Sequence, residues 1–201
     1  MMEWIAFEDQ ARAEGYTCMC GIDEAGRGPL AGPVYAAAVV LRPGQVIEGV
    51  NDSKKLSEKK REALFDTICS QCAAYGIGSA TEKEIDEVNI LNATYLAMQR
   101  AVAALPVQPD CALVDGNRAP DLPLEVRTII KGDAQSASIA AASILAKVSR
   151  DRYMLQMAEK YPQYAFEKHK GYGTKLHYER LEQYGISPIH RLSFLKKWMN
   201  R

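Results

Sequence analysis

Four acidic residues follow apolar segments that are typical of buried β-strands: Asp23, Glu24, Asp115 and Asp133. In a sheet flanked by helices, ligands bind where the chain leaves the strand ends. Carboxylates gathered there repel one another unless a cation lies between them, and Mg²⁺ and Mn²⁺ prefer carboxylate oxygens. Two such ions can activate a water and stabilise the leaving oxygen of a phosphodiester. Together the acids predict a divalent metal site for hydrolysis, although Asp133 alone is equally compatible with a helix cap.

A glycine-rich turn, Gly26-Arg-Gly-Pro-Leu-Ala-Gly32, comes directly after the first two acids. It lacks the Gly-Lys-Ser/Thr of a nucleotide P-loop. Glycines without side chains let backbone N–H and C=O groups approach a ligand closely. Arg27, between two glycines, can make a bidentate contact to phosphate. The turn therefore predicts a substrate-binding element next to the acids.

Hydrophobic patterning divides the chain into alternating strands and helices. Strands are expected at residues 16–22, 34–41, 75–80, 111–114 and 126–130. Helices are expected from Ser57 to Cys72, from Glu82 or Asn89 to Ala104, from Ser136 to Lys160, at 175–183 and at 193–199. The small apolar residues after Ser136 predict a central helix packed tightly on the sheet. The alternation predicts an α/β fold, a mixed β-sheet flanked by helices.

The 201 residues fit one domain, residues 1–201, with a basic helical appendage over about 160–201. Charge is unevenly distributed. Residues 1–146 hold 13 Lys and Arg against 20 Asp and Glu, whereas residues 147–201 hold 12 against 5. A face that grips phosphates explains this asymmetry, and so does a solvated basic helical surface without a partner.

Composition argues against a membrane or exported protein. Hydrophobic residues make up 47% of the chain and charged residues 25%, and no apolar run reaches the ~20 residues of a membrane helix. Glu3, Glu8 and Asp9 break a signal-peptide pattern, so we expect a cytoplasmic protein, and we expect a monomer. The five cysteines are expected to be reduced, and the three histidines show no zinc-ligand spacing.

Several segments together resemble the type 2 ribonucleases H, the family of bacterial ribonuclease HII. The N-terminal signature is Asp23-Glu-Ala-Gly-Arg-Gly-Pro-Leu-Ala-Gly-Pro-Val34. Further matching segments follow in the expected order at residues 51–57, 113–117, 131–133, 141–152 and 169–174. The resemblance extends from residue 21 to about 194, nearly the whole chain.

The resemblance implies a ribonuclease H-like fold with a helical C-terminal appendage. It implies an endonuclease that cuts the RNA strand of RNA–DNA hybrids and nicks duplex DNA 5′ to an embedded ribonucleotide, leaving a 3′-hydroxyl and a 5′-phosphate. It assigns metal binding and catalysis, with Mn²⁺ or Mg²⁺, to Asp23, Glu24, Asp115 and Asp133. It assigns 2′-hydroxyl recognition to Gly26, Arg27 and Gly28, the nucleotide at the RNA–DNA junction to Tyr172, and phosphate contacts to Lys54 and Lys55.

Other interpretations remain open at this stage. A 3′–5′ exonuclease is expected to carry Asp-x-Glu rather than adjacent acids, and a resolvase shares the type of sheet. A catalytically silent nucleic-acid-binding module gains nothing from acids that face phosphates. Ribonuclease HIII normally carries an extra N-terminal domain, and the 22 residues before Asp23 are too few for one.

Overall fold

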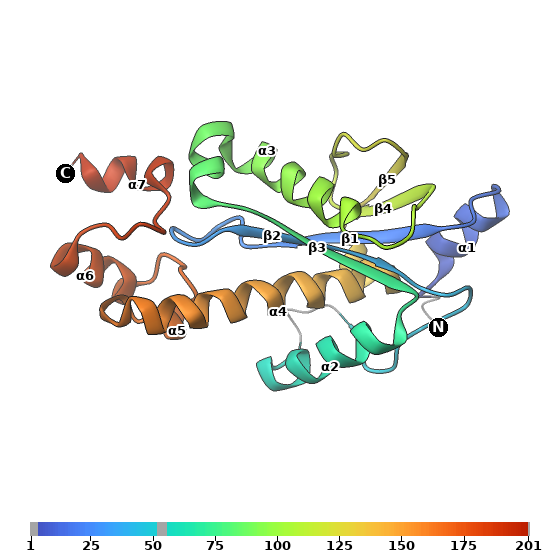
Figure 1. Cartoon of the computed structure of the whole chain (residues 1–201), viewed down its shortest axis with the longest axis horizontal. Coiled ribbons are helices and arrows are strands. Elements are labelled where there is room, and N and C mark those ends of the chain that lie inside the picture. Colours follow the sequence, from blue (N-terminus) through green and yellow to red (C-terminus); the bar gives the residue numbers. More distant parts are fainter. Residues whose placement is uncertain (1–3, 52–55, 201) are drawn as a thin grey trace.

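Five strands form one mixed sheet at the centre of the molecule (Figure 1), in a computed structural model that describes residues 4–51 and 56–200. The strands are β1 (Met19–Ala25), β2 (Val34–Val40), β3 (Ala74–Ala80), β4 (Cys111–Asp115) and β5 (Glu125–Ile129). Their order is β3-β2-β1-β4-β5. β2 is antiparallel to both of its neighbours, whereas β4 runs parallel to β1 and to β5. The predicted mixed sheet is confirmed.

Helices cover both faces of this sheet. The helices are α1 (Ala6–Ala13), α2 (Glu58–Gln71), α3 (Glu82–Ala103), α4 (Ala137–Lys160), α5 (Phe166–His169), α6 (Lys175–Tyr184) and α7 (Leu192–Met199). Two short 3₁₀ turns, η2 (Gly132–Ala134) and η3 (Pro162–Tyr164), flank α4. In Figure 1, α3 lies on one face of the sheet, and α4 with α2 lies on the other.

The middle strand β2 shows how the two layers of core arise. Ala36 and Ala38 pack in the cluster with α3, whereas Ala37 and Val39 pack in the cluster with α2 and α4. Successive side chains of a strand point to opposite faces. A strand covered on both faces is therefore apolar along its whole length, as this one is.

The first half of α4 lies directly on β1. A Cβ atom at Gly21 would overlap the backbone of Ser138, so only glycine allows this approach. The Ser136 hydroxyl accepts a hydrogen bond from the Ile139 N–H at 3.3 Å and caps the helix. The expectation of a central, tightly packed helix is confirmed.

α3 contains two helical segments joined at a sharp break. Thr81 and Glu84 form a reciprocal capping box at its start. Asn89 then adopts a left-handed φ of 69°, and its side-chain oxygen accepts from the N–H groups of Leu91 and Asn92 at 3.0 and 3.1 Å. Both starts expected from the sequence, Glu82 and Asn89, are thus real helix starts.

The C-terminal helices surround the second half of α4. Their shared cluster includes Met154, Phe166, Leu181 and Leu195, and it also contains Leu30 from the glycine-rich turn. The chain after residue 160 is therefore packed against the turn that follows the first two acids.

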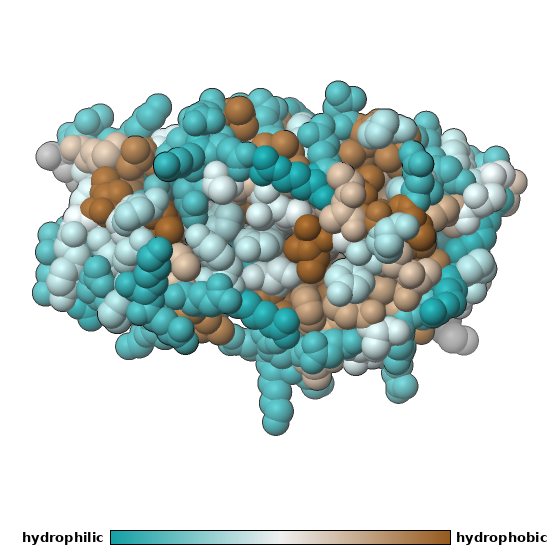
Figure 2. Space-filling view, viewed as in Figure 1, coloured by the Kyte–Doolittle hydropathy of each residue, from teal (hydrophilic) through white to brown (hydrophobic). Residues whose placement is uncertain are grey.

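Polar side chains cover most of the face shown in Figure 2, where apolar side chains form separate patches. Across the stretches 4–51 and 56–200, no helix combines the length and apolarity needed to cross a bilayer.

Candidate active site

The first two acids lie inside a strand and not after it. β1 continues to Ala25, because Asp23 and Glu24 still pair with β2, opposite Ala37 and Ala36. The expected end of this strand at residue 22 is therefore wrong by three residues. Asp115 is the last residue of the parallel neighbour β4. The same ends of parallel strands meet at one edge of a sheet, so Asp23, Glu24 and Asp115 line one cavity of about 260 Å³.

Asp133 lies beside this cavity, in the turn η2, and is buried. It does not cap α4, because Ser136 does. Instead, the N–H of the preceding Gly132 donates to Asp115 Oδ1 at 2.6 Å and ties the turn to the end of β4. The structure thus brings three predicted acids into one wall and places the fourth next to it.

The neighbouring acids change the pKa of Asp23. Burial raises the pKa of Asp23 well above its usual value, and the charges of Glu24, Asp115 and Asp133 raise it further. The N–H of Glu24 donates to Asp23 Oδ1 at 2.7 Å and opposes this shift. A buried cluster of carboxylates that repel one another in this way is suited to a hard divalent cation.

The acids are near one another but are not arranged as a finished coordination shell. Within residues 4–51 and 56–200, no three His, Cys, Asp or Glu side chains converge in a metal-ligand geometry. Glu24 Oε1 lies 3.4 Å from the Arg27 guanidinium, and Asp115 accepts from the backbone of Gly132. The backbone therefore sets the position of the acids, and the oxygen donors fit Mg²⁺ or Mn²⁺ once the side chains turn toward an ion.

The glycine-rich turn and Tyr172 line the same cavity as the acids. Gly26, Arg27 and Gly28 form one side of it. Gly28 is exposed, and a Cβ atom there would lie 3.8 Å from the Tyr172 ring. The Tyr172 side chain is 44% exposed, so its ring is available to a ligand. The predicted recognition residues thus border the predicted chemical site.

Two buried arginines hold the glycine-rich turn in place, a role that sequence reasoning missed. Their guanidinium groups donate to backbone carbonyls of the turn. Arg150 bonds to Ala31 and Pro33 at 3.1 and 3.2 Å, and Arg191 bonds to Gly26, Arg27 and Gly32 at 2.6, 3.0 and 2.8 Å. Both arginines belong to the basic segment 147–201, so part of that charge is buried and does not face a ligand.

Burial of Arg191 is costly: the pKa of this guanidinium is lowered to about 9, mainly by burial and in part by nearby Arg150. Gly26 must be glycine at this contact. Its φ is +99°, and a Cβ atom would overlap the Arg150 side chain. The backbone of the turn is therefore held by two arginines from the C-terminal part of the chain.

Two more side chains of α4 reach the acidic cavity. Ser143 and Lys147 both line it. The Ser143 hydroxyl is buried without a hydrogen-bond partner in the part of the chain that the structure describes. Lys147 Nζ lies 2.7 Å from Asp151 Oδ1. Sequence reasoning missed both residues, although they stand in the segment 141–152 that carried the family resemblance.

A second hollow adjoins the first. It measures about 170 Å³ and shares Glu24, Arg27 and Asp115 with the acidic cavity. Asn117 and Arg118 line its other side. Glu24 and Asp115 thus line both hollows.

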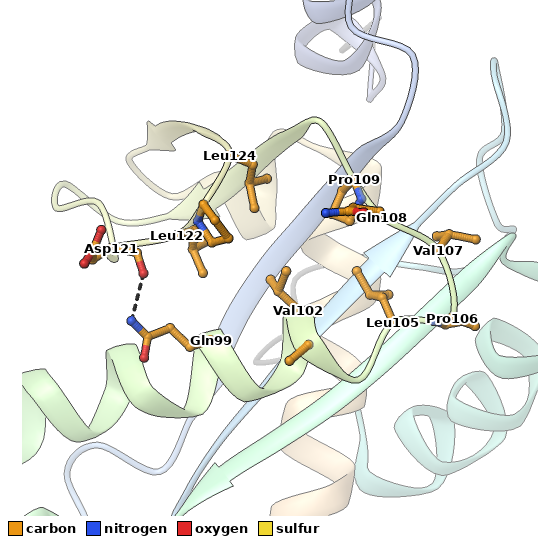
Figure 3. Close-up of a pocket in the computed structure, with 12 residues that line it drawn as sticks. Gln99, Val102, Leu105, Pro106, Val107, Gln108, Pro109, Asp121, Leu122 and Leu124 are labelled. Atoms are coloured by element: carbon orange, nitrogen blue, oxygen red, sulfur yellow. Dashed lines mark hydrogen bonds between the residues drawn. The ribbon is translucent and has the colours of Figure 1, made fainter.

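A cavity larger than the acidic one lies elsewhere in the described structure. It measures about 620 Å³ and is formed where the chain enters β4 and β5, at the sheet edge opposite the acids (Figure 3). Most of its lining is apolar, with Val102, Leu105 and Leu122 prominent, and Gln99 donates to the Asp121 carbonyl at 2.8 Å. It has no cluster of acids, so the chemistry belongs to the smaller cavity.

Some expected site residues remain untested. Lys54 and Lys55 lie outside the described residues. All five cysteines are free. Burial raises the pKa of the Cys20 thiol to about 12, which makes it unreactive.

The sheet order and the acids at the ends of β1 and β4 define a nuclease of the ribonuclease H class. Solved structures share this fold. The ribonuclease H2 of Pyrococcus horikoshii is 31% identical with a TM-score of 0.73, covering 88% of this chain and 93% of its own. The ribonuclease HII of Archaeoglobus fulgidus, solved in a complex with PCNA, is 28% identical with a TM-score of 0.69, covering 88% and 94%.

The sequence places the chain more narrowly. The Ribonuclease HII family model matches residues 20–197. The ribonuclease HII of Caldicellulosiruptor bescii is 58% identical over 96% of this chain and 94% of its own, and that of Marinomonas sp. is 62% identical over 88% and 89%. The chain belongs to the ribonuclease HII family. It is therefore a hydrolytic endonuclease of the ribonuclease H class, and the interpretation as a silent binding module is excluded.

Proposed function

We propose that the chain cuts the RNA strand of RNA–DNA hybrids and nicks duplex DNA on the 5′ side of an embedded ribonucleotide, and so acts in ribonucleotide removal. One observation carries this proposal. The acids Asp23, Glu24 and Asp115 share a single cavity with the turn 26–28 and with Tyr172. A sugar that contacts the turn therefore places its neighbouring phosphate at the acids.

We propose that Mg²⁺ or Mn²⁺ is held by Asp23, Glu24, Asp115 and Asp133. The carboxylate set and the raised pKa of Asp23 support this assignment. A more distant relative of the same fold, a Bst ribonuclease HIII that is 18% identical, has been solved in complex with Mn²⁺. The bound ions would activate water and stabilise the leaving 3′-oxygen. Burial and the neighbouring carboxylates raise the pKa of Asp23, and a bound cation would favour its ionised form.

The turn 26–28 is proposed to recognise the 2′-hydroxyl through its backbone. This hydroxyl is both donor and acceptor, and it distinguishes RNA from DNA. Gly28 is exposed and has no side chain to block the approach, and the arginines beneath the turn fix its carbonyls. Arg27 is proposed to leave Glu24 and to contact a phosphate once a cation neutralises the acids.

Tyr172 is proposed to provide a flat surface for the nucleotide at the RNA–DNA junction. Its exposed ring faces Gly28 across the cavity. Aromatic rings stack on nucleotides without reading base identity. The preference for a junction would therefore come from sugar recognition on one side and stacking on the other.

Exposed lysines are proposed to hold the duplex backbone. Lys168 is exposed, whereas Lys170 is partly buried and donates to the Glu167 carbonyl. Lys54 and Lys55 remain proposed phosphate contacts. Since one chain supplies all the site residues, we propose that it acts as a monomer, in the cytoplasm.

The test is a mapped cleavage reaction. The protein is incubated with Mg²⁺ or Mn²⁺ and duplex DNA that carries one ribonucleotide, and the products are sized at nucleotide resolution. We expect a single nick 5′ to the ribonucleotide with a 3′-hydroxyl, and no product with Asp23→Asn. Cleavage of an all-DNA duplex, or a cut elsewhere, would contradict the proposal.

A further inference from the structure

Three buried histidines lie behind Tyr172, and the site described above does not use them. His169, His177 and His190 are 7%, 0% and 3% exposed. The rings of His169 and His177 stack at 4.3 Å between centroids. His177 Nε2 lies 2.9 Å from His190 Nε2, which connects a histidine of α6 to one in the segment before α7.

Hydrogen-bond partners fix the proton positions on this chain of rings. The Ser187 N–H can only donate, and it lies 2.9 Å from His190 Nδ1, which must accept. His190 therefore carries its proton on Nε2 and donates to His177 Nε2. His177 then carries its proton on Nδ1, which donates to the Tyr172 carbonyl at 2.9 Å. One direction of donation is consistent with every contact, and it runs from Ser187 to Tyr172.

His169 holds the other side of the same residue. Its ring accepts from the Gly171 N–H at 3.2 Å and donates from Nε2 to the Tyr164 carbonyl at 3.0 Å. The His169 carbonyl accepts from the Tyr172 N–H at 2.8 Å. Both backbone groups of Tyr172 are therefore held by histidines.

All three rings are neutral in this arrangement. The pKa of His177 is lowered to about 4 and that of His190 to about 3, mainly by burial and in part by a neighbouring histidine. The hydrogen bonds require a neutral His177. If both of its ring nitrogens carried protons, His177 Nε2 could not accept the proton that His190 Nε2 donates.

The loop that carries Tyr172 needs such support. Lys170 has a left-handed φ of 49° and Gly171 a φ of 86°. A non-glycine residue in this region is strained and persists only where its surroundings hold it. The histidines supply directional bonds here, which apolar packing of the same volume does not.

We propose that Ser187, His190 and His177 form a positioning relay that holds the Tyr172 ring against the substrate cavity and thereby sets the preference for an RNA–DNA junction. This inference rests on the proposed role of Tyr172. The relay residues do not contact substrate and act only through the Tyr172 backbone.

The first test reads the relay in the wild-type protein, without activity. Long-range ¹H–¹⁵N correlation spectra at pH 7 report which ring nitrogen of each histidine carries the proton. We expect His177 to be protonated on Nδ1, and His190 and His169 on Nε2. Protonation of His177 on Nε2, or on both nitrogens, would overturn the relay whatever Tyr172 does.

The second test compares His177→Leu with His177→Asn. An asparagine amide can occupy the place of Nδ1 and donate to the Tyr172 carbonyl, whereas leucine fills space but donates nothing. We expect His177→Leu to cut the single-ribonucleotide duplex about five- to tenfold more slowly, with a smaller loss on a continuous hybrid. His177→Asn should recover most of the loss. The thermal unfolding of both variants is measured alongside.

A double variant separates the relay from the role of Tyr172. On the single-ribonucleotide duplex, Tyr172→Ala with His177→Leu should be no slower than Tyr172→Ala alone. Equal losses on both duplexes, with additive effects, would show that His177 is only a packing residue. Selective loss in Tyr172→Ala with none in His177→Leu would overturn the relay alone. If Tyr172→Ala loses no more activity on the single-ribonucleotide duplex than on the hybrid, both the junction role of Tyr172 and the proposed role of the relay are overturned.

Discussion

The acidic cavity and the support behind the glycine-rich turn and Tyr172 differ in what their polar groups face: carboxylates face one another in the cavity, whereas the supporting side chains face backbone groups. In the cavity, the neighbouring carboxylates raise the pKa of buried Asp23, and the Ser143 hydroxyl has no partner in the described structure. Behind the turn, the buried guanidinium groups of Arg150 and Arg191 donate to backbone carbonyls, although Arg150 Nη1 has no hydrogen-bond partner in the described structure. Behind Tyr172, neutral imidazoles pair with backbone groups and with one another.

This contrast separates chemistry from recognition. The acids of the described structure are not arranged as a finished coordination shell, and under the proposed function a divalent cation would stabilise them. The proposed recognition surface, residues 26–28 and Tyr172, has a held backbone: Arg191 donates to the carbonyls of Gly26 and Arg27, and His177 pairs with the Tyr172 carbonyl. Changes in the cavity should therefore abolish the reaction without unfolding the protein, whereas changes behind the turn should affect stability or substrate preference.

The largest effect is expected from the acids. Asp23→Asn, Glu24→Gln and Asp115→Asn should each reduce cleavage by at least about a hundred- to thousandfold, because each removes a charge that supports the transition state. Asp133→Asn should also be inactive. Cleavage assays with circular dichroism check this, and a variant with wild-type turnover would remove that residue from the site.

Asp23→Asn should abolish cleavage and yet leave the metal-free protein as stable as the wild type or more stable. The folded pKa of Asp23 is raised, so the metal-free protein loses stability as pH rises through the usual and then the raised pKa of this carboxyl. Asp23→Asn should therefore unfold at the same or a higher temperature than the wild type at pH 7 in EDTA. A lower unfolding temperature would show that the charge is stabilising.

Gly26→Ala should lower the stability of the fold, whereas Gly28→Ala should lower cleavage without changing stability. At Gly26 a Cβ overlaps Arg150 and φ is positive, so we expect a loss of about 1–3 kcal/mol in the free energy of unfolding. At Gly28 a Cβ meets only the Tyr172 ring at 3.8 Å, so stability should be unchanged. Cleavage by Gly28→Ala should still fall by up to about a hundredfold, because the sugar is displaced from the acids. Urea unfolding with cleavage rates distinguishes the two, and equal stability losses would contradict the account.

Tyr172→Ala should lower cleavage about ten- to hundredfold on DNA with one ribonucleotide, since stacking is worth ~1–3 kcal/mol. The loss should be smaller on a continuous RNA–DNA hybrid, where other registers remain open. Tyr172→Phe keeps the ring and serves as the control. If Tyr172→Ala cuts both duplexes like the wild type, Tyr172 is a packing residue.

The smallest effect concerns Lys168. Duplex affinity should fall with salt with a slope of about −0.9 per neutralised phosphate. Lys168→Glu should reduce that slope by about one and leave the cleavage position unchanged. A salt-independent affinity would show that the basic surface does not hold the duplex.

Much of this arrangement could be predicted from the sequence. Apolar runs predicted the positions of the strands, and the acids near the ends of these runs predicted the acidic cavity. The end of β1 was misplaced because Asp23 and Glu24 are poor strand formers, yet pairing with β2 keeps them in the strand. The short helix α1 was missed, although its buried Glu8 accepts from the hydroxyls of Ser136 and Ser138 at 2.7 and 2.6 Å.

The support behind the turn was not predictable from spacing. Arg150 and Arg191 counted as surface charge because nothing local distinguishes a buried arginine from an exposed one. His177 and His190 are 13 residues apart, a spacing that no local pattern joins, and they meet only because α6 and the segment before α7 pack together. Such roles depend on tertiary contacts between segments that sequence patterns treat separately.

Separation of chemistry from recognition is tested most directly by a calorimetric titration of Mn²⁺ into Gly28→Val, with wild type and Asp115→Asn beside it. Gly28→Val blocks the turn but leaves the acids in place, so it should bind Mn²⁺ like the wild type while cutting neither duplex. Asp115→Asn should lose Mn²⁺ affinity. If Gly28→Val loses Mn²⁺ binding together with cleavage, or cleaves normally, the acids and the turn 26–28 do not have separate roles in metal binding and substrate recognition.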